Sequence, residues 1–166
     1  MFTLPTLIAL AGIEQWALPD HSSPHRILWI TPRWAKEFNA LPPSPPRTGR
    51  LTRRPGPRDA LAALATAFVR GDPKSHLIRP HGEGSHPIFR RMRTPHACVV
   101  EFRTWETRTF GFFANRNSFV ACGVGLADEI KDRHLYIPHA QQVARLLARL
   151  LPTEFDCKTD VKDLCT

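Results

Sequence analysis

The sequence predicts an α+β fold: a small antiparallel sheet with two helices packed on one face and a C-terminal helix. Three observations predict it. A short apolar run at 27–30 leads directly into a well-marked helix start, three apolar runs separated by short turns lie within 97–124, and apolar side chains repeat at helical spacing over 139–151. We expect the first strand and the three-strand meander to share one sheet.

The length bounds the domain organisation. At 166 residues the chain suffices for one domain with a single core. The turn formers "LPDHSSPH" separate an N-terminal extension, residues 1–25, from a domain that we place at 26–151. A Pro/Arg-rich insertion is expected within the domain at 42–58, and residues 152–166 form a C-terminal tail.

The first strand and helix carry the clearest local signals. In "RILWITPRWAKEFNAL", the strand covers 27–30, Thr31 has an N-capping side chain, and Pro32 suits the first helical position. The helical repeat then places three apolar side chains on one face, those of Trp34, Phe38 and Leu41.

The insertion and the second helix follow. Residues 42–58 hold six prolines and five arginines, so they cannot bury enough apolar surface to order themselves. A solvated loop is one interpretation, and a basic arm that touches nucleic acid is the other. Asp59 is expected to cap the helix "ALAALATAFVR", which Gly71 and Pro73 end.

The meander places charged side chains opposite the core. Alternation directs Val100 and Phe102 inward, with Glu101 and Arg103 on the other face. Because two helices suffice to cover one face, we expect the second face to be open to solvent and available for binding. A polar connection, "GLADEIKDRHLYIP", then leads to the last helix.

Charge points to a polyanionic partner. Lys and Arg number 23 against 15 acidic residues, which gives a formal net charge of +8, and the pI is about 10.0. The alternative is a generally basic protein without such a partner. The apolar start "MFTLPTLIALAGIEQW" is too short to span a bilayer, so we expect no membrane association.

Cysteine and histidine spacing argues against metal. The four cysteines have no C-x-x-C spacing, so neither a disulfide framework nor a zinc ribbon is expected, and Cys98 and Cys122 are interpreted as buried free thiols in a cytoplasmic protein. The histidines of the connection at 72–96 match no metal-binding spacing. We expect no metal and no cofactor.

The order of several motifs resembles the RelE/ParE toxin superfamily of bacterial toxin–antitoxin systems. The resemblance is closest to the RelE and HigB-like branch, which includes phage-derived host-killing members. It lies in "ILWITPRWAKEFNAL", in "PIFRRMR" leading to "CVVEFRTWETRTFGFF", and in "SFVACGVGLADEIKDRHLYIPHAQQVARLL". In that branch a Glu-Leu-Arg-like triplet ends one strand and an arginine opens the next. Here "EFR" and Arg108 match them.

The resemblance implies an endoribonuclease, an mRNA interferase that cleaves messenger RNA on the ribosome. It also implies a small antitoxin partner, expected to be of the helix-turn-helix type, and it allows a homodimer or a toxin–antitoxin hetero-oligomer. Metal-free cleavage would use the 2′-hydroxyl as the nucleophile, with cations on the phosphate and groups that transfer protons.

Arginines are the expected phosphate ligands, because the guanidinium is always charged and bidentate. Arg103 and Arg108 are assigned this role on the open face. Their alternative is cross-strand pairing with Glu101 or Glu106. Arg90, Arg91 and Arg93 precede the meander, where the resemblance implies RNA-binding basic residues; a plain basic loop is the alternative.

Proton transfer is assigned to His134 and Tyr136, because histidine titrates near neutral pH and Tyr136 is the single tyrosine. Lys131 and Arg133 beside them are expected to bind RNA. A core role for Tyr136 is equally consistent with its apolar setting, and His139 is interpreted as a helix-start residue.

Two other functions stay open. The ParE branch shares the fold and inhibits a topoisomerase by protein contact, so the fold alone does not choose between the branches. A non-catalytic module that binds nucleic acid or protein is the other alternative.

Overall fold

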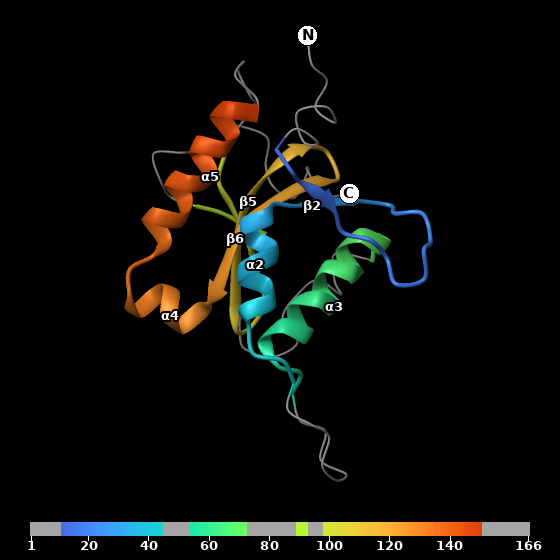
Figure 1. The fold of residues 1–166 in the computed structure, drawn as a ribbon, viewed down its shortest axis with the longest axis horizontal. Helices are drawn as coiled ribbons and strands as arrows, with labels where there is room; N and C mark the ends of the chain where they lie inside the picture. Colours follow the sequence, from blue (N-terminus) through green and yellow to red (C-terminus); the bar gives the residue numbers. More distant parts are fainter. Residues whose placement is uncertain (1–10, 45–53, 73–88, 93–97, 151–166) are drawn as a thin grey trace.

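A computed structural model describes residues 11–44, 54–72, 89–92 and 98–150, which Figure 1 draws in colour. Several predictions lie outside the described residues. These are the role of Arg93, Leu151 and Pro73 at two helix ends, most of the insertion at 42–58, and the tail at 152–166.

The described core is a six-stranded mixed sheet, in the order β1-β2-β6-β5-β4-β3. The strands are β1 (Glu14–Gln15), β2 (Ile27–Ile30), β3 (Phe89–Arg91), β4 (Val100–Arg103), β5 (Thr107–Asn115) and β6 (Ser118–Leu126). The structure confirms the predicted meander of β4, β5 and β6. It also confirms the predicted first strand of the sheet, β2, at 27–30.

The prediction of a purely antiparallel sheet is wrong. β2 runs parallel to β6, with Ile27 opposite Ser118 and Ile30 opposite Ala121. A parallel pair needs a long connection, and here the rest of the domain separates the two strands. β1 and β3 add to the sheet edges, but at two and three residues they are too short to show an alternating pattern.

The helix α2 (Pro32–Ala40) begins as predicted. The Thr31 hydroxyl accepts a hydrogen bond from the Trp34 N–H and donates one to the Cys122 carbonyl, so the cap also ties the helix to β6. Trp34 is buried and its ring stacks on Phe38 at a centroid distance of 4.8 Å.

The helix α3 (Pro57–Arg70) differs from the prediction at its start. It begins two residues before Asp59, with Gly56 at the N-cap and Pro57 in the first turn. Asp59 lies within that turn and accepts a hydrogen bond from the Ser44 N–H at 2.9 Å. Gly71 ends the helix as predicted, in the left-handed conformation that favours glycine, with φ of 79°.

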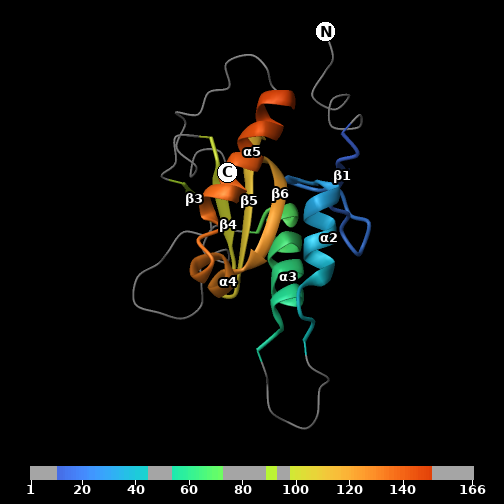
Figure 2. The ribbon, with the colours of Figure 1, turned by 60° about the vertical axis from the view of Figure 1, so that its left-hand side comes forward.

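Both faces of the sheet are covered, contrary to the expectation of an open face (Figure 2). α2 and α3 cover one face, where Phe102, Phe113 and Phe119 pack with Phe68 of α3. On the other face, Phe110, Phe112 and Cys122 pack with Ala140 and Val143.

The second layer consists of α4 (Ala127–Asp132) and α5 (Tyr136–Leu150). α4 lies in the stretch predicted to be a polar connection, and six residues are too few to show a helical repeat. α5 starts three residues earlier than predicted. The apolar side chains along one side of α5 pack against the sheet. The open-face prediction failed because α5 was not assigned to either face.

Residues before Arg26 also contact the domain. Ile13 and Leu18 are buried, and Trp16 lies edge-on against Trp34 with centroids 5.9 Å apart. Cys122 is buried and free as expected, whereas Cys98 is disulfide-bonded, contrary to the prediction of a free thiol. None of the described helices is long and apolar enough to cross a bilayer.

Candidate functional site

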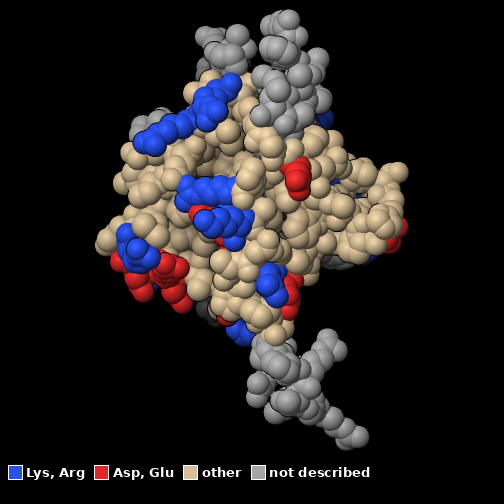
Figure 3. Space-filling view, in the orientation of Figure 1, with Lys and Arg blue, Asp and Glu red and all other residues tan. Residues whose placement is uncertain are grey.

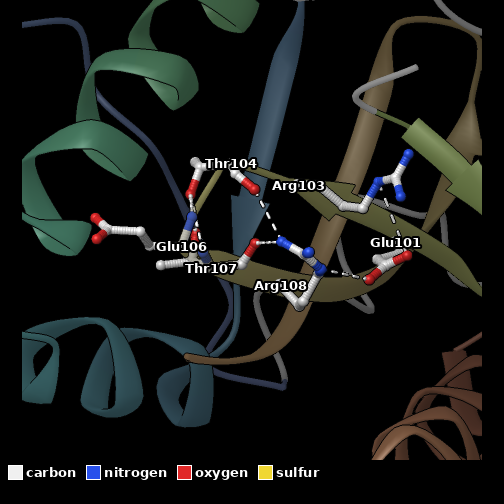
Figure 4. Close-up of polar contacts among 6 residues, drawn as sticks. All are labelled: Glu101, Arg103, Thr104, Glu106, Thr107 and Arg108. Atoms are coloured by element: carbon white, nitrogen blue, oxygen red, sulfur yellow. Dashed lines mark hydrogen bonds and ion pairs between the residues drawn. The ribbon is translucent and has the colours of Figure 1, made fainter. Parts of the chain in front are cut away.

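Arg103 and Arg108 lie directly opposite each other on β4 and β5. Val100 and Phe102 point toward α3, so alternation directs Glu101 and Arg103 to the opposite face, as predicted. α5 covers part of that face, which was expected to be open. Figure 4 shows the carboxylate of Glu101 beside both guanidinium groups. We call Glu101, Arg103 and Arg108 the arginine cluster.

Glu101 is the counter-ion of both arginines. Its carboxylate lies 3.1 Å from Nε of Arg108 and 3.9 Å from Nε of Arg103. Glu101 is 4% exposed and Arg103 8%, so the charges are largely withdrawn from water. Buried charges persist only when they are paired. The pairing alternative is therefore realised through Glu101.

The backbone fixes the orientation of Arg108. Its Nη1 donates to the carbonyls of Thr104 and Thr107, each at 2.8 Å. The turn that supplies these carbonyls is itself held by a 2.7 Å hydrogen bond between the hydroxyls of Thr104 and Thr107 (Figure 4). Among the described residues, Nη2 has no hydrogen-bond partner, and the side chain is 13% exposed. A preorganised guanidinium with one unused edge suits a phosphate oxygen.

An aromatic stack lies next to the arginine cluster on the same face. Phe110 is opposite Glu101 and two residues after Arg108 on β5. The His139 ring stacks on Phe110 with a centroid distance of 4.5 Å and an interplanar angle of 8°. Tyr136 meets the same ring edge-on at 6.0 Å. α5 therefore brings Tyr136 and His139 to the row of the sheet that holds Glu101.

His139 is the histidine of the aromatic stack, and it lies in the first turn of α5, in keeping with its interpretation as a helix-start residue. It is 8% exposed. Burial lowers the pKa of His139 and the Arg33 cation adds to this effect, while the carboxylates of Glu37 and Glu129 oppose it. The imidazole is therefore neutral at neutral pH and able to accept a proton. The only feature of the sequence that pointed to His139 was its position in the first turn of the predicted last helix.

His134 lies apart from this stack. It connects α4 to α5 with φ of 53°, and its N–H donates to the Lys131 carbonyl. Its side chain is exposed, and no described contact links it to the arginine cluster. Tyr136 is thus brought close to the cluster, whereas His134 is not.

Lys131 and Arg133 are exposed at the end of α4, where acidic residues offset them. Arg133 forms an ion pair with Glu129 at 2.7 Å, and Asp128 and Asp132 lie on the same short helix. Figure 3 shows acidic side chains gathered beside basic ones over α4. This arrangement gives no local excess of positive charge for RNA.

Arg90 and Arg91 lie on the edge strand β3, where Arg90 is opposite Glu101. Arg90 is exposed and Arg91 half-buried. Arg90 therefore extends the row of Glu101 and Phe110 to the edge of the sheet. In the described part of the chain, no three His, Cys, Asp or Glu side chains are grouped so as to hold a metal ion.

In comparisons with known proteins, the chain matches no protein-family model, no curated protein and no solved structure.

Proposed function

We propose that the protein is the toxin of a toxin–antitoxin system and cleaves messenger RNA as a metal-free endoribonuclease. The single observation that carries this proposal is the arginine cluster next to the aromatic stack. The cluster supplies fixed cations for a phosphate, and the stack supplies a neutral histidine and a tyrosine.

The cluster supports phosphate binding better than a loose basic patch would. The carbonyls of Thr104 and Thr107 hold Arg108 in place, so little side-chain entropy is lost when its remaining edge meets an anion. The net charge of +8 attracts RNA over a distance. The resemblance to the RelE/ParE superfamily implies two partners, and we include both in the proposal: mRNA on the ribosome and a small antitoxin.

Primer extension on RNA from induced cells tests the proposal. We expect cuts within translated codons, growth arrest, and rescue by co-expression of the adjacent open reading frame. Intact messages together with double-stranded DNA breaks would instead identify a topoisomerase poison and overturn the nuclease.

Two variants of Arg108 test the site within that assay. Arg108→Gln removes the cation, and Arg108→Lys keeps the charge without the fork, so we expect both to lower cleavage by about tenfold or more. Arg70→Gln is the matched control, because Arg70 pairs with Asp20 at 2.9 Å, away from the cluster. Thermal unfolding of each variant separates lost cleavage from lost folding, and full cleavage by folded Arg108→Gln would contradict the role.

One observation favours the protein-binding alternative. Glu101 pairs with both arginines of the cluster, so a ParE-like toxin could use the same fold without cutting RNA. Purified gyrase supercoiling assays with the wild-type chain distinguish this function from cleavage.

A further inference from the structure

The helix α5 has an outer side as well as the side that packs on the sheet. Its buried residues, among them His139 and Val143, face the sheet. The helical repeat of 3.6 residues places Arg145 and Arg149 on the opposite side, where both are exposed. We define the outer face of α5 by five exposed residues on this side, Pro138, Gln141, Gln142, Arg145 and Arg149.

The outer face of α5 carries positive charge without a counter-charge. Of the four described helices, α5 alone contains no Asp or Glu. Neither Arg145 nor Arg149 forms an ion pair or a hydrogen bond with a described residue. Figure 3 shows basic side chains over the upper part of α5 with no acidic side chain beside them. An anion that approaches this face therefore meets guanidinium groups that have no other ligand in the described chain.

Two exposed arginines on other helices provide the contrast. Arg33 of α2 lies 2.6 Å from a carboxylate oxygen of Glu37, and Arg70 of α3 lies 2.9 Å from one of Asp20. An acid already neutralises each of these arginines, so a phosphate would have to compete with that acid for the guanidinium. No such competition arises on the outer face of α5.

The helix dipole accounts for only one of the two arginines of α5. A cation in the last turn of a helix is stabilised by the partial negative charge at the C-terminus. Arg149 lies in the last turn of α5, which ends at Leu150. Arg145 lies one turn further back, where this effect has faded. The dipole therefore does not explain why two cations follow one another along the outer face.

The spacing of the two arginines suits successive phosphates of one strand. Residues four apart lie on the same side of a helix, about 6 Å apart along its axis, and successive phosphates of an RNA strand have a similar spacing. Guanidinium groups bind phosphate oxygens with their planar fork of donors. Gln141 and Gln142 add amide groups of the kind that contact phosphate and sugar.

The side chains of the outer face favour RNA over a protein partner. The centre of a protein interface consists mainly of large apolar and aromatic side chains. From Gln141 to the end of α5, the exposed side chains are those of glutamine, arginine and alanine. Ile137 is the large exposed apolar residue of α5, and it lies in the first turn, away from the two arginines.

We propose that the outer face of α5 binds the phosphate backbone of RNA through Arg145 and Arg149. This inference rests on the proposed function, which supplies RNA as the ligand, and adds a surface separate from the arginine cluster. The inner side of α5 carries Tyr136 and His139 of the aromatic stack. Because a helix is about 10 Å across, the outer face holds a part of the RNA other than the phosphate at the arginine cluster.

Binding of an RNA that cannot be cut tests the surface. A labelled 2′-O-methyl strand lacks the nucleophilic hydroxyl, so its affinity can be measured without cleavage, by fluorescence anisotropy at several salt concentrations. We expect Arg145→Gln/Arg149→Gln to bind about tenfold more weakly at low salt. The slope of log K against log salt should become less steep by about 1.4, because two phosphate contacts are lost.

Two further double variants serve as controls. Arg33→Gln/Arg70→Gln removes the same amount of charge, so long-range attraction falls equally, but we expect the salt slope of wild type. Arg145→Lys/Arg149→Lys should bind within about threefold of wild type, because lysine still binds phosphate as a point charge. Circular dichroism checks that each variant is folded. Equal slopes in the two glutamine variants, or a lysine variant as weak as its glutamine counterpart, would overturn the proposal.

Cleavage of ordinary RNA separates this inference from the proposed function. Arg145→Gln/Arg149→Gln should need about tenfold more protein for half-maximal single-turnover cleavage. Its maximal rate should stay close to that of wild type, because the outer face does not touch the reacting phosphate. Weaker binding of the 2′-O-methyl strand by this variant, in a protein that cuts no RNA, would retain the surface and reject the nuclease. Unchanged binding in a protein that cuts RNA would reject the surface alone.

The same titration with polyglutamate tests for an acidic protein as the partner. We expect polyglutamate to bind wild type more weakly than the RNA strand does at equal charge. Loss of polyglutamate binding without loss of RNA binding in Arg145→Gln/Arg149→Gln would assign the outer face to an acidic protein and overturn the proposal.

Discussion

At the scale of single residues, Glu101 determines how the arginine cluster behaves. It lies between two guanidinium groups on a face that is largely closed to water. Without the carboxylate, Arg103 and Arg108 would face each other as like charges in a site of low polarity. The sequence placed Glu101 on this face by alternation, but it could not show which acid pairs with the arginines.

We expect Glu101→Gln to lower the free energy of unfolding by about 3 kcal/mol, because breaking a buried ion pair leaves uncompensated charge. Urea denaturation followed by circular dichroism measures this change. Glu106→Gln is the control, since Glu106 is exposed on the neighbouring turn, and should change the free energy by less than about 0.5 kcal/mol. Equal effects of the two variants would show that Glu101 is not the counter-ion.

His139 should make stability depend on pH. Its pKa is lowered by burial, so the unfolded chain takes up a proton as pH falls below the ordinary value of 6.5 while the folded chain resists. The free energy of unfolding should therefore fall between pH 7.5 and pH 5 in wild type.

The difference between wild type and His139→Gln isolates this contribution. The difference in the free energy of unfolding between the two proteins should become smaller as pH falls, because only the wild type loses the stability linked to the neutral imidazole. Asp20 and Asp59 also have lowered pKa values, but their effect belongs below the ordinary value of 3.8. Parallel pH curves for the two proteins would contradict a buried neutral His139.

At the scale of elements, the local signals of the sequence decided what could be predicted. Thr31 and Pro32 fixed the start of α2 because a cap and a proline act within a few residues. Alternation fixed the meander and the side of the sheet on which Glu101 lies. α4 escaped prediction because six residues show no periodicity, and Asp59 was misplaced because Gly56 and Pro57 begin the helix earlier.

Thr31 joins α2 to β6, and its hydroxyl makes both contacts. We expect Thr31→Ala to lower the free energy of unfolding by about 2 kcal/mol, from the lost cap at the Trp34 N–H and the lost bond to the Cys122 carbonyl. Thr31→Ser keeps the hydroxyl and should lose less than about 1 kcal/mol. Thermal unfolding of both variants measures this, and equal losses would assign the effect to the methyl group.

At the scale of the whole molecule, the candidate site depends on contacts that no local pattern specifies. Glu101, Phe110 and His139 come from β4, β5 and α5, and only the assembled sheet brings them together. The sequence therefore predicted that Arg103 and Arg108 share one face of the sheet, but it assigned proton transfer to His134, which the structure places apart from the aromatic stack. That choice depended on which face of the sheet α5 covers, which is a tertiary property.

The net charge of +8 predicts salt-dependent binding of single-stranded RNA. Each phosphate contact releases condensed counterions, with a slope of about −0.7 in log K against log salt per contact on a single strand. Arg90 lies exposed beside the row of Glu101 and Phe110, so Arg90→Gln should reduce the slope by about that amount. Arg70→Gln should leave it unchanged, because Asp20 already neutralises Arg70. Fluorescence anisotropy of a labelled oligonucleotide at several salt concentrations measures both slopes, and an unchanged slope in Arg90→Gln would exclude β3 from the RNA path.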